Sequence, residues 1–125
     1  MDVLKIEYET GRMELNINMF FPCNLSAGKK IAALINRGCT KEDKSELLLE
    51  LRSMAEGYQR IIQENKDTLE EYKQYCAATG SMARPNSDAI KHCEIEIRKY
   101  EALKKRVERN IDFIERGEKN GKKKR

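Results

Sequence analysis

Apolar and polar residues alternate at the start of the chain. From Leu4 to Tyr8, and again from Met13 to Phe21, every second residue is apolar. A period of two is typical of a strand with one buried face. The sequence therefore predicts a β-hairpin over residues 1–21, with Thr10-Gly11 as its two-residue turn.

This turn fixes which residues of the two strands face each other. Tyr8 is then predicted to lie opposite Met13, on the apolar face of the hairpin. The same register places Glu7 opposite Glu14, a pair of like charges that counts against it. Because an isolated two-stranded hairpin is marginally stable in water, its apolar face must pack on helices.

The rest of the chain has the periodicity of helices. Apolar residues at spacings of three and four predict a short helix over residues 24–38 and two long helices over residues 40–79 and 86–117. The long helices have a period near 3.5, and only a short loop connects them. They are therefore predicted to form an antiparallel, coiled-coil-like helical hairpin.

Individual residues mark the predicted helix ends. Asn24 or Ser26 can cap the short helix, and Thr40 with Asp43 resembles a capping box at the start of the first long helix. Gly117 is followed by a lysine-rich segment, so we expect the last helix to end there.

These elements together define the predicted fold class, which is α+β. We expect a single domain over residues 1–117, followed by a disordered basic tail over residues 118–125. A length of 125 residues allows one such domain with a modest core.

The charge of the chain is concentrated at its end. Charged residues make up 37% of the sequence, and the net charge is +4. Residues 118–125 hold five bases and one acid, which leaves 20 bases and 20 acids for residues 1–117. The body is therefore neutral, and attraction to phosphate must come from the tail or from local patches.

The composition also indicates where in the cell the protein is expected. No apolar run approaches the roughly 20 residues that a membrane span needs. The N-terminus has no basic segment followed by an apolar one, so a secretion signal is not expected. We expect a cytoplasmic protein with reduced thiols.

The sequence offers no evident catalytic centre. His92 is the only histidine, and the four cysteines contain no Cys-x-x-Cys pair. We therefore expect no catalytic residues, no metal site and no cofactor, and predict that the protein is not an enzyme. Cys76 and Cys93 can approach across the helical hairpin, either as a disulfide or as two packed thiols.

Two groups of basic residues are candidates for binding. Lys29 and Lys30 follow Gly28 near a helix start, where free backbone N–H groups can hold an anion, although the spacing of a phosphate-binding loop is absent. A basic stripe along the last helix, with the tail, can track a phosphate backbone or a partner surface. The basic stripe and tail comprise Lys91, Arg98, Lys105, Arg106, Arg109, Arg116, Lys122, Lys123, Lys124 and Arg125.

The chain resembles a group of small bacterial proteins. It is short and rich in Lys, Glu, Ile and Asn, and a strand leads into a helix through the segment Phe20-Phe21-Pro22-Cys23-Asn24-Leu25-Ser26. In size, composition and style it is similar to the accessory proteins of bacterial mobile genetic elements, a group that includes anti-CRISPR inhibitors. This resemblance implies stoichiometric inhibition of a nuclease or of its nucleoprotein complex.

The sequence thus predicts a non-enzymatic interaction protein. It is expected to bind and to inhibit or modulate a protein or nucleoprotein partner, with a CRISPR effector nuclease as the target that the resemblance implies. The alternative is a nucleic-acid-binding accessory protein that contacts RNA or DNA through the basic stripe and tail. Apolar helical surface beyond what the hairpin covers can also form a homodimer. No membrane partner is expected.

Overall fold

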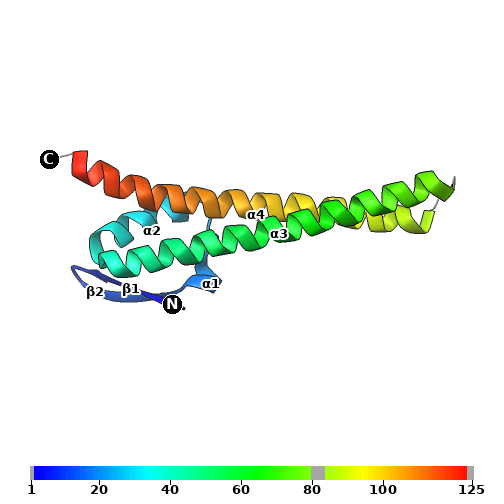
Figure 1. Ribbon diagram of the computed structural model, residues 1–125. Coiled ribbons are helices and arrows are strands. Elements are labelled where there is room, and N and C mark those ends of the chain that lie inside the picture. Colours follow the sequence, from blue (N-terminus) through cyan, green and yellow to red (C-terminus); the bar gives the residue numbers. More distant parts are fainter. Residues whose placement is uncertain (1, 80–83, 124–125) are drawn as a thin grey trace. The chain divides into compact units, whose positions relative to one another are not determined.

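The structure is a computed structural model that describes the backbone of residues 2–79 and 84–123 and the side chains of residues 2–75 and 88–116. It confirms the α+β class, because an N-terminal two-stranded sheet is followed by helices, the two longest of which pack together (Figure 1). The elements are β1 (Val3–Tyr8), β2 (Gly11–Asn16), α1 (Ile17–Phe20), α2 (Leu25–Gly38), α3 (Lys41–Thr79) and α4 (Arg84–Lys123). Within the described residues, none of the helices has the length and apolar character of a membrane span.

The contacts divide the chain into two compact units. The first unit comprises Met1–Ala55 and Lys105–Arg125, and the second comprises Glu56–Lys104. The first unit contains the sheet, α1, α2, the start of α3 and the end of α4, whereas the second contains the remaining parts of the two long helices. The single domain predicted over residues 1–117 stays a prediction.

The hairpin has a different register from the predicted one. Its turn is Glu9-Thr10, and Ile6 rather than Tyr8 lies opposite Met13. Because the shift is an even number of residues, the same side chains remain on the apolar face. The observed register pairs opposite charges on the other face, with Lys5 opposite Glu14 and Glu7 opposite Arg12. It therefore removes the like-charge pair of the predicted register.

The predicted second strand is too long. β2 ends at Asn16, whose Oδ1 accepts a hydrogen bond from Met19 N at 3.1 Å and so caps the short helix α1. Although the sequence continues to alternate after Asn16, Met19 is 86% exposed and Phe21 is buried. The hairpin predicted over residues 1–21 therefore ends at Asn16, because a local side-chain cap favours a helical turn there.

The starts of α2 and α3 follow the predicted capping. Asn24 Oδ1 accepts from Ala27 N at 2.8 Å, and Thr40 Oγ1 accepts from Asp43 N at 3.1 Å. Each side chain satisfies an N–H group that has no partner within its helix.

The bounds of α4 differ from the predicted 86–117 at both ends. The helix starts at Arg84 and includes Pro85, a residue that the first turn tolerates. It also continues through Gly117 to Lys123, so residues 118–123 of the predicted disordered tail are helical. Glycine inside a helix costs only about 1 kcal/mol, so Gly117 does not have to end the helix. Residues 124 and 125 of the predicted tail lie outside the described residues.

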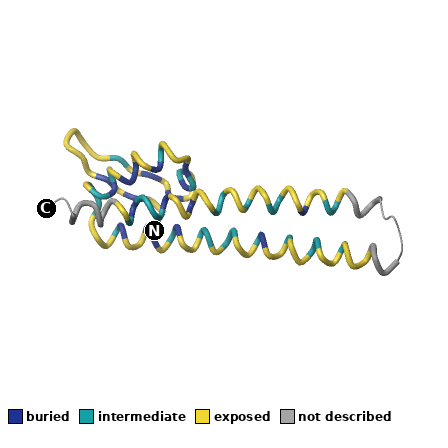
Figure 2. The backbone as a smooth tube through the Cα atoms, turned by 90° about the horizontal axis from the view of Figure 1, so that it is seen from above, coloured by how far each residue is buried: buried dark blue, intermediate teal, exposed yellow. Residues whose placement is uncertain are grey.

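The apolar core of the first unit lies between the hairpin and the helices around it, where the buried positions of Figure 2 gather. Leu4, Ile6, Ile17, Ile35, Leu47 and Leu51 are fully buried there, together with Val107 and Ile114 of α4. In the second unit, the long helices bury Ile62 and Cys93, and the rings of Tyr58 and Tyr100 lie with their centroids 5.8 Å apart.

Candidate interaction surfaces

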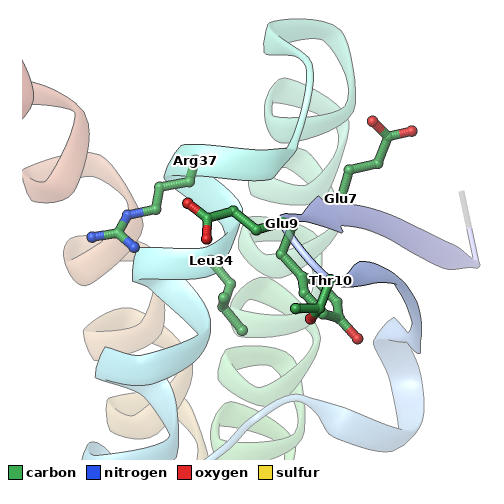
Figure 3. A pocket seen from close by; sticks show the side chains of 6 residues that line it. Glu7, Glu9, Thr10, Leu34 and Arg37 are labelled. Carbon is green, nitrogen blue, oxygen red and sulfur yellow. The ribbon is translucent and has the colours of Figure 1, made fainter.

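A groove lies between the turn of the hairpin and α2, within the first unit. It has a volume of about 510 Å³. Figure 3 shows its lining side chains, which are Glu7, Tyr8, Glu9, Thr10, Leu34 and Arg37. We call this feature the turn groove.

Close backbone contact fixes the walls of the turn groove. Gly38, at the end of α2, lies so near β1 that a Cβ atom on it would be 2.0 Å from the carbonyl oxygen of Glu7. The adjacent Cys39 Sγ donates a hydrogen bond to the carbonyl oxygen of Lys5 at 3.3 Å. The end of α2 is therefore held directly against the outer edge of β1.

The turn groove combines apolar surface with opposite charges. Tyr8 is 44% exposed and Leu34 is half-buried. At the mouth, the carboxylate of Glu9 points toward Arg37 (Figure 3), yet within the described side chains neither residue takes part in an ion pair. Both side chains are exposed, so their charges are accessible to a binding partner.

The sequence did not reveal the turn groove. Its lining comes from two segments more than 20 residues apart. In addition, the predicted turn at Thr10-Gly11 put Tyr8 opposite Met13, whereas it lies opposite Gly11. The only usable signal was the charge pattern of the strands, because the correct register pairs Glu7 with Arg12 and Lys5 with Glu14.

The predicted basic stripe is exposed, but acids interrupt it. All six of its members with described side chains are exposed: Lys91 and Arg98 in the second unit, and Lys105, Arg106, Arg109 and Arg116 in the first. A shallow groove of about 480 Å³ along α4 is lined by Lys105, Glu108, Arg109, Ile111, Asp112 and Glu115.

The balance of charge along α4 is not strongly positive. The groove along α4 has two bases and three acids. Of the stripe, Arg116 is paired, with its Nε 2.9 Å from Asp112 Oδ2, and the acid Glu115 pairs with Arg52 of α3 at 3.0 Å. This part of the stripe is therefore not a continuous cationic track. The side chains of the predicted Lys122 and Lys123, and residues Lys124 and Arg125, lie outside the described side chains.

Gly28, which precedes the predicted anion site at Lys29 and Lys30, has a role in helix packing. Gly28 is buried, and a Cβ atom there would lie 2.7 Å from Asn110 Nδ2 of α4. Lys29 Nζ lies 5.8 Å from the ring centroid of Phe113, a cation–π distance. Gly28 therefore allows α2 to approach α4, while anion binding by the two exposed lysines stays a prediction.

A buried asparagine of α4 binds the segment that leads into α2. Asn110 is 2% exposed, accepts from Cys23 N at 3.0 Å and donates to Cys23 O at 3.3 Å. Its amide thus satisfies both backbone groups of a residue 87 positions away, just before α2. Hydrophobic patterning did not single out this residue, because its amide binds the backbone of a distant segment.

A second polar cluster, which is partly buried, links three helices. Asn36 Nδ2 donates to the carbonyl oxygens of Ala32 and Ile114, at 2.9 Å and 3.3 Å. Asn36 Oδ1 in turn accepts from Nζ of Lys44, a residue that is only 8% exposed. The cluster joins α2, α3 and α4 inside the first unit.

The thiols of the first unit are protected from ionisation. Burial raises the pKa of Cys23 above its ordinary value, and burial together with the nearby negative charge of Asp43 raises the pKa of Cys39. In the second unit, Cys93 is a buried free thiol. The side chain of Cys76, its candidate partner, lies outside the described side chains.

These raised pKa values predict a loss of stability at alkaline pH. Above the ordinary thiol value of 9.0, the unfolded chain releases the protons of Cys23 and Cys39 while the folded protein still holds them. The free energy of unfolding should therefore decrease as the pH rises above about 9. Urea unfolding at a series of pH values measures this, and replacing both cysteines by alanine should flatten the decrease. An unchanged slope in the double variant would contradict this assignment.

No group of three or more His, Cys, Asp or Glu side chains that could hold a metal ion occurs among the described residues.

Comparisons of the chain with protein-family models, curated proteins and solved structures find no match.

Proposed function

We propose that this chain is a non-enzymatic interaction protein of the cytoplasm. In this proposal it binds a protein or nucleoprotein partner and inhibits or modulates it, as the resemblance to anti-CRISPR inhibitors implies. The observation that supports this most strongly is the turn groove, which combines the exposed charges of Glu9 and Arg37 with the apolar surface of Tyr8 and Leu34.

The composition of the turn groove suits recognition of a protein. Tyrosine and arginine are enriched among the residues that dominate protein–protein affinity, and both line this groove. The carboxylate of Glu9 comes from the turn of the hairpin, next to Tyr8 in the chain, while Arg37 comes from α2. A partner segment with one basic, one acidic and one apolar side chain would complement these groups.

Nucleic-acid binding has weaker support from the described surface. The groove along α4 has more acids than bases, and Arg116 is already paired with Asp112. Within the stripe, Arg98, Lys105 and Arg109 are exposed and would provide most of the contact with phosphates.

Affinity capture from bacterial lysate, with and without nuclease treatment, tests the proposed function. The wild-type chain should retain a specific protein partner after nuclease treatment. Tyr8→Ala and Arg37→Glu should each reduce its recovery about tenfold or more, in line with the loss of an interface anchor. Arg60→Glu is the matched control, because Arg60 is an exposed arginine of the second unit that does not line the turn groove.

The same experiment can contradict the proposal. Recovery of nucleic acid alone, lost at raised salt and in an Arg98→Glu, Arg109→Glu variant, would favour the alternative function. Equal capture of a protein partner by wild type, Tyr8→Ala and Arg37→Glu would exclude the turn groove as its binding site.

A further inference from the structure

The two edges of the hairpin differ in what covers them. On β1, the edge that faces away from β2 is covered by the end of α2, because Gly38 contacts the backbone of Glu7 and Cys39 donates to Lys5 O. On β2, no described residue outside the hairpin hydrogen-bonds to the backbone of Arg12 or Glu14. An open strand edge is a template for pairing with another strand.

The observed bonds show which backbone groups of β2 point outward. Ile17 N donates to Asp2 O at 2.9 Å, so residues 2 and 17 form a hydrogen-bonded pair. Such pairs alternate along an antiparallel ladder, so residues 4, 6 and 8 exchange bonds with their partners on β2. The N–H and C=O groups of Arg12 and Glu14 therefore point away from β1. The outward direction of Lys5 O, which Cys39 binds, agrees with this alternation.

We propose that β2 pairs antiparallel with β2 of a second copy of this chain, about a two-fold axis at Met13. In this register Arg12 of each copy lies opposite Glu14 of the other. The outward groups of these residues then form four backbone hydrogen bonds, and the two hairpins join into a four-stranded sheet.

Charge selects this register among those that the outward groups allow. A shift of the two-fold axis to residue 12 places Arg12 opposite itself, and a shift to residue 14 places Glu14 opposite itself. Both shifts bring like charges together across the strands, which is unfavourable. Only the axis at Met13 pairs the two opposite charges twice. Charged residues usually protect an edge strand from pairing, whereas here their order is self-complementary.

Charge-reversal variants test this pairing without changing the backbone. Arg12→Glu leaves two acids on the edge, and Glu14→Arg leaves two bases. Each variant alone should dimerise about tenfold or more weakly than wild type, as judged by sedimentation equilibrium over a range of concentrations. An equimolar mixture should recover association as a heterodimer, because the acidic edge of one variant then faces the basic edge of the other. Circular dichroism of each variant verifies that it is folded.

A covalent probe tests the register independently. Met13→Cys places a thiol next to its copy at a non-hydrogen-bonded pair, the geometry in which antiparallel Cα atoms approach most closely. Mild oxidation should give a disulfide-linked dimer that the wild-type chain, with its native cysteines, does not give. A wild-type chain that sediments as a monomer at every concentration would overturn the proposal, even if the variants were unfolded. So would a dimer that neither charge reversal weakens. Partner capture through the turn groove is measured separately, so the two proposals can fail separately.

Discussion

Replacing Gly38 by alanine is expected to destabilise the first unit by about 3 kcal/mol or more, the cost of severe overpacking against rigid atoms. The new Cβ atom would lie 2.0 Å from the carbonyl oxygen of Glu7 and 2.9 Å from its amide nitrogen. These atoms belong to the backbone of β1 and cannot rotate away. Either the hairpin separates from α2 or the end of α2 unwinds, and the measurement is the free energy of unfolding in urea.

Gly57→Ala is the matched control for this substitution. Gly57 lies inside α3, and a Cβ atom there has no neighbour within 4 Å. Because alanine is the better helix former, Gly57→Ala should stabilise the protein by about 1 kcal/mol. If both substitutions changed the free energy of unfolding in the same direction, the close approach of α2 to β1 would not be the reason that Gly38 is required.

The Gly38 substitution also has a consequence for binding. Gly38 holds the end of α2 against β1, and these two elements form the walls of the turn groove. In any Gly38→Ala protein that remains folded, capture of a partner through the turn groove should fall together with stability. The pairing of β2 with a second copy uses the opposite edge of the hairpin, so it should be less affected.

The elements of the fold could be predicted because their patterns are local. Thr40 and Asn24 are N-caps as expected, and the alternation from Leu4 to Tyr8 forms β1. The register of the hairpin could not be assigned from hydrophobicity, because a shift by two residues keeps the same apolar face. Only the charges on the exposed face distinguish the two registers.

The surfaces were harder to predict because they depend on contacts between distant segments. The turn groove requires the contact between Gly38 and Glu7, which no local pattern encodes. Conversely, the basic stripe could be identified from helical spacing alone. Its neutralisation by Asp112 depends on a side-chain ion pair that the structure supplies.

Replacing Asn110 by alanine is expected to cost about 3 kcal/mol, because it leaves two buried backbone groups of Cys23 without partners. Asn65→Ala is the control. Asn65 is half-buried, and its amide donates to Ile61 O of its own helix. Its loss should change stability by less than about 1 kcal/mol, since alanine also has the higher helix propensity.

A double-mutant cycle with Gly28 shows whether Asn110 acts through the approach of α2 to α4. In the wild-type background, the Cβ atom of Gly28→Ala meets Asn110 Nδ2 at 2.7 Å and should destabilise the protein. In the Asn110→Ala background that atom is gone, and the same substitution should cost at least about 1 kcal/mol less. Additive effects would mean that the contact between Gly28 and Asn110 does not limit the packing of α2. A coupling of the expected sign would show that the two residues act together. Gly28 leaves the space that the Asn110 amide occupies, and that amide binds the segment leading into α2.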